Sequence, residues 1–99
     1  MTKEIIIKTL EEHLPVLVAE YGVKRIGLFG SYARAQADEN SDIDIVVEFE
    51  QPIGFMFIEF AEYLEHLLGG RVDVLTPAGI EGIRRTGVAE DIAGSVLYV

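Results

Sequence analysis

A helix-like segment lies between two short strand-like runs, and this order restricts the topology more than any other feature of the sequence. Residues 42–49 alternate and then become apolar, as in a half-buried strand, and residues 71–76 form a second such run that Pro77 ends. Between them, apolar residues recur at steps of three and four over residues 57–68, as on one face of a helix. A strand–helix–strand connection of this length favours a right-handed crossover, so we expect two parallel neighbouring strands.

Before these elements, the sequence predicts one further helix and one further strand. Apolar residues follow helical spacing over residues 6–18, and Thr2 is in place to cap the helix. Pro15 is expected to break or bend this helix. Residues 24–29 are typical of a strand, and the connection from there to residues 42–49 is short. We therefore expect these two strands to be antiparallel neighbours.

Together these elements predict a single α/β domain over residues 1–99, with a three-stranded mixed sheet flanked by helices. The tail, residues 78–99, is expected to be partly helical. The absence of cysteine excludes a disulfide scaffold, a thiolate metal site and a cysteine nucleophile. No apolar run is long enough to span a bilayer, and no secretion leader follows Met1, so we expect a cytoplasmic protein without membrane contact.

The charge is spread unevenly along the chain. The formal net charge is −9, and residues 38–65 contain nine acids but no Lys or Arg. A surface that binds duplex nucleic acid needs Lys and Arg to neutralise phosphates, so we expect no direct duplex binding. A cation, or a nucleotide that arrives with its cation, is a better match to this composition.

Three carboxylates are expected to meet at one end of the sheet. Asp42 and Asp44 stand at alternate positions of one strand, so both point to the same face, where bare carboxylates repel each other unless a cation lies between them. Asp73, near the start of the neighbouring parallel strand, can reach this face. Mg²⁺ is typically held by one or two carboxylates plus substrate phosphates. Asp73 either completes a second Mg²⁺ site or takes the proton from an attacking hydroxyl.

A Gly-Ser turn ends the strand that precedes these acids. Gly30 has no Cβ and lets the backbone approach a ligand, while Ser31 offers a hydroxyl and a backbone N–H where a short helix begins. Arg34, one turn further on, can reach the same phosphates. Phosphate-binding groups beside metal-binding acids are what the transfer of a nucleotidyl group from a nucleoside triphosphate requires.

The pattern of Gly30-Ser31, ten residues, and then Asp42-Ile43-Asp44 resembles the signature of the DNA polymerase beta nucleotidyltransferase superfamily. More narrowly, residues 26–48 resemble the minimal nucleotidyltransferase (MNT) domains, and residues 71–77 supply the third acid. Only the extreme N-terminus and the tail match loosely. The resemblance implies the polymerase beta-like nucleotidyltransferase fold, a nucleotidyl transfer that depends on two Mg²⁺ ions, and ATP as the substrate.

The resemblance also implies a protein partner. MNT domains are typically encoded beside a HEPN-domain ribonuclease toxin, and some transfer AMP from ATP to a tyrosine of that toxin and silence it. By this resemblance the chain is expected to be an antitoxin that acts by AMPylation. Larger relatives carry a helical domain that grips the acceptor, for which this chain has no room. A partner protein is therefore expected to help build the acceptor side.

Two other functions stay open from the sequence. The chain could be a non-catalytic module that neutralises the toxin by occlusion, or a subunit of an aminoglycoside-like nucleotidyltransferase that modifies a small molecule. Arg84 and Arg85 fit either a pair at a helix terminus or a contact to triphosphate or partner. The sequence does not determine the nucleotide preference, the acceptor residue, the number of AMP units added, or whether the chain forms a homo- or hetero-oligomer.

Overall fold

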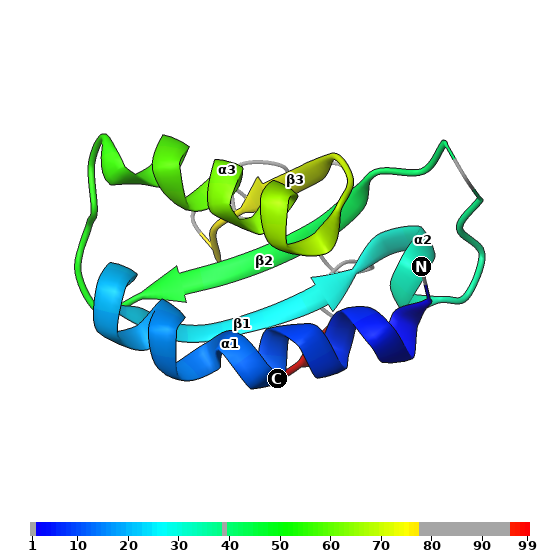
Figure 1. Cartoon of the computed structure of the whole chain (residues 1–99), viewed down its shortest axis with the longest axis horizontal. Helices are drawn as coiled ribbons and strands as arrows, with labels where there is room; N and C mark the ends of the chain where they lie inside the picture. Colours follow the sequence, from blue (N-terminus) through cyan, green and yellow to red (C-terminus); the bar gives the residue numbers. More distant parts are fainter. Residues whose placement is uncertain (1, 39, 78–95) are drawn as a thin grey trace.

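The computed structural model of this chain describes residues 2–38, 40–77 and 96–99. Most of the tail predicted to be partly helical lies outside the described residues, as do Arg84 and Arg85. Among the described helices, none is long and apolar enough to cross a membrane. Figure 1 shows the arrangement of the elements, which in chain order are α1 (Lys3–Tyr21), β1 (Val23–Phe29), α2 (Gly30–Ala33), β2 (Ile43–Phe49), α3 (Met56–Leu68), β3 (Val72–Leu75) and β4 (Leu97–Tyr98).

Helix α1 begins and ends at residues that favour helix termini. The Thr2 side chain accepts a hydrogen bond of 3.3 Å from a backbone N–H of the first turn, and Gly22 ends the helix with a φ of 70°. Pro15 lies inside α1, so the predicted break of the helix is wrong. Leu10 and Leu17, on either side of Pro15, are buried in the same core, and this packing holds one helix together across the missing N–H.

The sheet has the strand order β3-β2-β1-β4, so it contains four strands and not the predicted three. The predicted pairings are confirmed, because β1 runs antiparallel to β2 and β2 runs parallel to β3. The extra strand, β4, pairs with β1 and places Tyr98 opposite Gly27. A Cβ on Gly27 would lie 2.7 Å from Val96 Cγ1, so this glycine makes room for the C-terminal strand. With only two residues, β4 is too short for an alternation pattern to predict it.

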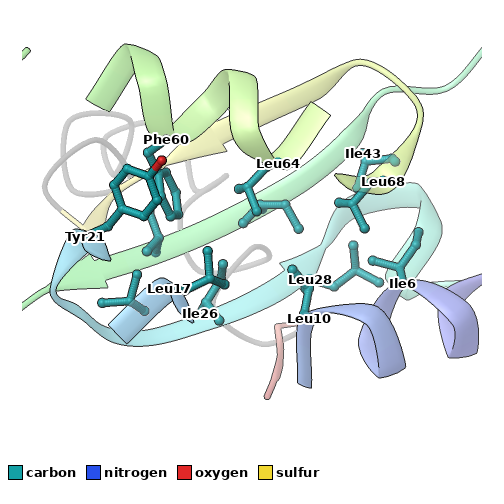
Figure 2. Close-up of a cluster of buried hydrophobic side chains, with 13 residues drawn as sticks. Ile6, Leu10, Leu17, Tyr21, Ile26, Leu28, Ile43, Phe60, Leu64 and Leu68 are labelled. Carbon is teal, nitrogen blue, oxygen red and sulfur yellow. The ribbon is translucent and has the colours of Figure 1, made fainter. Parts of the chain in front are cut away.

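The hydrophobic core lies between the sheet and the two long helices, α1 and α3 (Figure 2). Its side chains come from one stripe of each helix and from alternate positions of β1 and β2. Among the described residues, no polar or charged side chain is buried. The opposite face of the sheet is therefore where the polar residues of β2 and β3 point. The main core residues are Ile6, Leu10, Leu17, Tyr21, Ile26, Leu28, Ile43, Ile45, Val47, Phe60, Leu64 and Leu68.

Candidate active site

The three predicted carboxylates lie where two neighbouring parallel strands begin. Asp44, in β2, is the register partner of Asp73, in β3. Partners in a parallel ladder point to the same face, so these two carboxylates lie side by side on the face away from α1 and α3. Asp42 directly precedes β2 and is exposed. The structure thus brings Asp44 and Asp73 together and leaves Asp42 at the rim.

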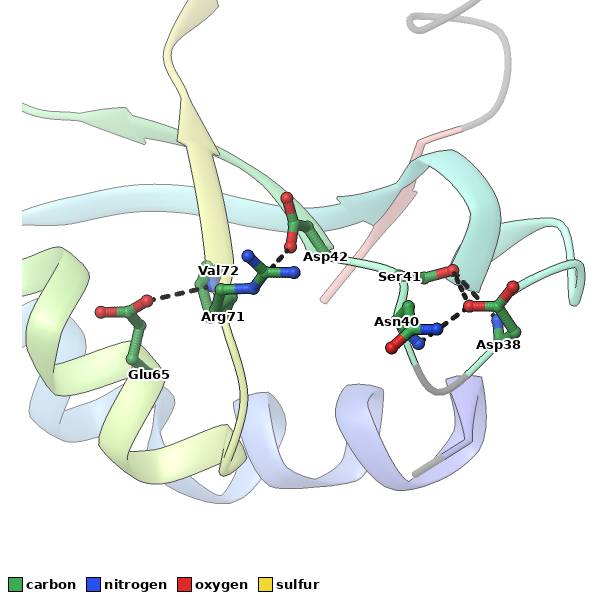
Figure 3. A network of polar contacts seen from close by, with 7 residues as sticks. All are labelled: Asp38, Asn40, Ser41, Asp42, Glu65, Arg71 and Val72. Atoms are coloured by element: carbon green, nitrogen blue, oxygen red, sulfur yellow. Dashed lines mark hydrogen bonds and ion pairs between the residues drawn. The ribbon is translucent and has the colours of Figure 1, made fainter.

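Asp42 has a cationic neighbour that the sequence interpretation did not include. Its Oδ1 lies 3.2 Å from Nε of Arg71, the residue that directly precedes β3 (Figure 3). The backbone supports this contact, because the Ile43 N–H donates a hydrogen bond of 2.9 Å to the Arg71 carbonyl. The signal that could have revealed the pair is positional: both residues stand immediately before a strand of the parallel pair.

The loop that leads into Asp42 is folded by its own side chains (Figure 3). Asp38 Oδ1 accepts a hydrogen bond of 2.8 Å from the Asn40 backbone N–H, and the Ser41 hydroxyl donates to the same oxygen at 3.3 Å. The Asp38 backbone N–H in turn donates to the Ser41 hydroxyl oxygen at 3.0 Å. Such local bonds are typical of Asx turns, and they set the direction in which the chain enters β2.

Gly30 begins α2 directly after β1 and packs against Asp44. The ladder pairs Phe29 with Asp44, which brings Gly30 beside the start of β2. Its φ is +75°, in the left-handed region that favours glycine. A Cβ on Gly30 would overlap the Asp44 carboxylate. Two features therefore favour glycine at this position: the left-handed backbone angle, and the Asp44 carboxylate that occupies the space of a Cβ.

The other two predicted phosphate-binding residues lie on the short helix α2. Ser31 follows Gly30, and its carbonyl accepts a hydrogen bond of 2.8 Å from the Gln36 N–H. Arg34 ends α2, and its Nε donates to the Gly30 carbonyl at 3.4 Å. The guanidinium lies close enough to Asp44 to lower the pKa of that carboxyl in part. Arg34 is therefore held next to the carboxylates and to the Gly-Ser turn.

The electrostatics of this edge depend on Asp44. Partial burial raises the pKa of the Asp44 carboxyl above its usual range, and the negative charges of Asp73 and then Asp42 raise it further. Arg34 opposes these effects but does not cancel them. Uncompensated negative charge is what a site for a divalent cation offers before the cation binds.

The donor set fits a hard divalent cation in its chemistry, since all three side chains offer carboxylate oxygens. In the part of the chain that the structure describes, no three acidic or histidine side chains already converge as a ready-made metal site. Asp44 and Asp73 lie side by side, whereas Asp42 pairs with Arg71.

A hollow of about 280 Å³ adjoins Arg71. Its wall includes Tyr32 of α2, Ser41 of the loop before β2, and the Gly69–Gly70 turn that ends α3. A larger hollow of about 450 Å³ lies between the start of α1 and the chain after α2. Asp42, Asp44 and Asp73 are absent from both walls, and Arg71 lines only the smaller of these two hollows.

Comparison with known proteins shows the family to which the fold corresponds. The nucleotidyltransferase domain family matches residues 6–99. A curated relative, the protein adenylyltransferase MntA of Thermococcus cleftensis, is 43% identical over 100% of this chain and 97% of its own length.

Two solved structures are also similar. One, described as a minimal nucleotidyltransferase, is 31% identical with a TM-score of 0.74 and covers 98% of this chain and 95% of that chain. The other, a toxin–antitoxin crystal structure with AMP-PNP, is 31% identical with a TM-score of 0.54. That match covers 77% of this chain and 57% of the other chain. The predicted nucleotidyltransferase fold is confirmed by these matches.

Proposed function

Because this chain belongs to the nucleotidyltransferase domain family and is an enzyme of that class, we propose that it is an antitoxin that transfers AMP from ATP to a tyrosine of a cognate HEPN-domain toxin. The observation that supports the site most directly is the register of Asp44 against Asp73, beside Gly30. The support for the partner comes from relatives: one is named a protein adenylyltransferase, and a similar structure is a toxin–antitoxin complex with an ATP analogue.

In this proposal each residue of the edge has a part. Gly30 and Ser31 receive the phosphates at the start of α2, and Arg34 pairs with a phosphate oxygen. Asp42 and Asp44 would hold Mg²⁺, and Asp73 would serve as the base of the transfer. When bound, Mg²⁺ would neutralise charge on the phosphates and so lower the barrier to attack on the α-phosphorus.

The transfer itself is a substitution at the α-phosphorus. The tyrosine oxygen forms a new bond to that phosphorus, and the bond between the α-phosphorus and the bridging oxygen of pyrophosphate breaks. Asp73 accepts the phenolic proton, and the electron pair leaves with pyrophosphate. Because the chain positions ATP and a partner presents the tyrosine, the reaction gains from holding both groups in one geometry.

The test measures label transfer from ATP labelled at the α-phosphate to the cognate HEPN protein. We expect Asp44→Asn to lower the rate by about 10²-fold or more, because one of the cation-holding oxygens is lost. Glu50→Gln is the matched control, since Glu50 is an exposed acid just beyond the other end of β2. Mass spectrometry of the product then locates AMP on the acceptor residue.

Two results would contradict the proposal. Label transfer by Asp44→Asn at the rate of the wild type would remove these acids from the reaction. If neither the wild type nor Asp44→Asn transferred label and both still silenced the toxin, occlusion would replace transfer as the mechanism of neutralisation.

A further inference from the structure

Arg71 and Asp42 are held side by side by the fold. Each residue directly precedes one strand of the parallel pair, and Ile43 and Val72 are the first register partners of that pair. The Arg71 carbonyl accepts the Ile43 N–H, and the Arg71 Nε lies 3.2 Å from Asp42 Oδ1. The backbone fixes the neighbourhood, but the two side chains are exposed, by 78% for Arg71 and 49% for Asp42 (Figure 3).

An ion pair this exposed is weak and exchanges easily. Water screens both charges, and the long arginine side chain loses rotamer freedom by staying in one place. The pair can therefore open whenever either partner meets a stronger one. Divalent cations are such partners for a carboxylate, and phosphate oxygens are such partners for a guanidinium.

The same carboxylate is needed for two purposes. In the proposed reaction Asp42 holds a cation, whereas in the structure its oxygen is paired with Arg71. A cation that arrives alone must displace the guanidinium and leave it unpaired beside another positive charge. A cation that arrives on a triphosphate brings phosphate oxygens with which the displaced guanidinium can pair.

We infer that Arg71 holds Asp42 in the nucleotide-free protein and exchanges that carboxylate for phosphate oxygens of the incoming nucleoside triphosphate. The exchange makes binding of the cation and of the nucleotide depend on each other. Arg71 is then a second phosphate-binding arginine, in addition to Arg34, which lies beside Gly30. This inference rests on the proposed function, because it requires a cation at Asp42.

The chain supplies a matched control pair. Arg25 Nε lies 3.0 Å from a Glu48 carboxylate oxygen, and Arg25 is exposed by 53%. Glu48 belongs to β2, like the acids of the edge, but stands near the other end of the strand. Removing Arg25 deletes the same charge from an exposed pair between β1 and β2. A difference between the two arginine variants is therefore specific to the Asp42 pair.

The experiment titrates Mn²⁺ into the purified protein and follows free Mn²⁺ by electron paramagnetic resonance, first without and then with a non-hydrolysable ATP analogue. Without the analogue, we expect Arg71→Gln to bind Mn²⁺ about two- to fivefold more tightly than wild type, the range set by an exposed ion pair. With Mn²⁺ present, we expect Arg71→Gln to bind the analogue about five- to tenfold more weakly than the wild type does. Arg25→Gln should leave both affinities close to those of the wild type.

Arg71→Lys checks that the guanidinium and not the charge alone is responsible, because lysine keeps the charge but lacks the fork that pairs with phosphate. It should restore the weak Mn²⁺ binding of wild type but only part of the analogue affinity. The inference is overturned if Arg71→Gln binds Mn²⁺ like Arg25→Gln, or more weakly than the wild type.

Asp42→Asn separates this inference from the proposed function in the same titration. If Asp42→Asn binds Mn²⁺ as tightly as wild type, Asp42 holds no cation, and the metal site of the proposed function fails. If Asp42→Asn loses Mn²⁺ affinity while Arg71→Gln matches the wild type, the metal site stands and only the exchange by Arg71 is wrong.

Discussion

The two faces of the sheet differ sharply in what their side chains do. Toward α1 and α3, β2 presents Ile43, Ile45 and Val47, which are fully or almost fully buried in the core. Toward the other face the same strand presents Asp44 and Glu48, with the buried Val46 between them. Because side chains alternate along a strand, Asp44 points away from the core residues on either side of it. Substitutions of core residues should therefore mainly change folding, and substitution of Asp44 should mainly change ligand binding and transfer.

The largest expected effect on stability comes from the helix-covered face. Phe60 is fully buried and packs edge-to-face on Tyr21 and on Phe49, with ring centroids 5.2 Å apart in both pairs. We expect Phe60→Ala to lower the free energy of unfolding by about 3–5 kcal/mol, because the cavity it leaves cannot close fully. Urea denaturation followed by circular dichroism measures this loss.

The control for this prediction is Glu62→Ala, on the exposed side of the same helix. It should change the free energy of unfolding by about 0.5 kcal/mol or less. A loss of less than about 1 kcal/mol for Phe60→Ala would show that the core tolerates a large cavity, and the contrast between the two faces would weaken.

A smaller effect, but one that separates folding from chemistry, is expected at Gly30. Gly30 and Gly69 have nearly the same backbone angle, with φ of +75° and +71°, but only Gly30 would place a Cβ on the Asp44 carboxylate. Both alanine variants should lose about 1–2 kcal/mol of stability from the left-handed backbone. Only Gly30→Ala should also lose AMP transfer, because its Cβ displaces the carboxylate.

The two variants are compared by thermal denaturation and by label transfer at a temperature where both are folded. Equal transfer by Gly30→Ala and Gly69→Ala would mean that the position of the Asp44 carboxylate does not matter for the reaction. A far greater loss of stability in Gly30→Ala than in Gly69→Ala would mean that the Asp44 side chain cannot move aside. The position of Asp44 would then matter for folding as well as for the reaction.

The arrangement of the strands could be predicted because connection length restricts direction. The short link from β1 to β2 indicated an antiparallel pair, and the helix between β2 and β3 indicated a parallel one. Those two pairings alone bring Gly30, Asp44 and Asp73 to one edge. The roles given to Ser31 and Arg34 stay predictions.

The features that could not be predicted depend on contacts between distant residues. Strand β4 pairs with β1 through the backbone, and the missing side chain of Gly27 leaves room for it. A strand of two residues is too short to show either feature as a sequence pattern. Helix α1 continues through Pro15 because the core holds both of its halves. Predicting the Arg71–Asp42 pair would have required knowing that each residue stands just before its strand. The sequence interpretation instead placed both residues inside the strands.

The smallest expected effect is a dependence of stability on pH at Asp44. Burial, then Asp73 and Asp42, raise the pKa of its carboxyl in the folded protein above that in the unfolded chain. A raised pKa means that the folded state holds this proton more strongly, so Asp44 contributes stability at low pH and loses that contribution as the pH rises through the folded pKa. At neutral pH, without a cation, the ionised carboxylate should therefore destabilise the fold.

Asp44→Asn removes that ionisation and should melt higher than the wild type at neutral pH, by roughly 2–4 °C for a gain of about 0.5 kcal/mol. The gain should shrink as the pH is lowered from neutral through the raised pKa of the wild-type carboxyl, because the wild-type side chain then becomes neutral as well. Glu50→Gln controls for the loss of one acid from an exposed position. Melting curves that differ by the same amount across this pH range would show that the Asp44 charge does not oppose folding. The polar face of the sheet would then carry the Asp44 charge without a cost in stability.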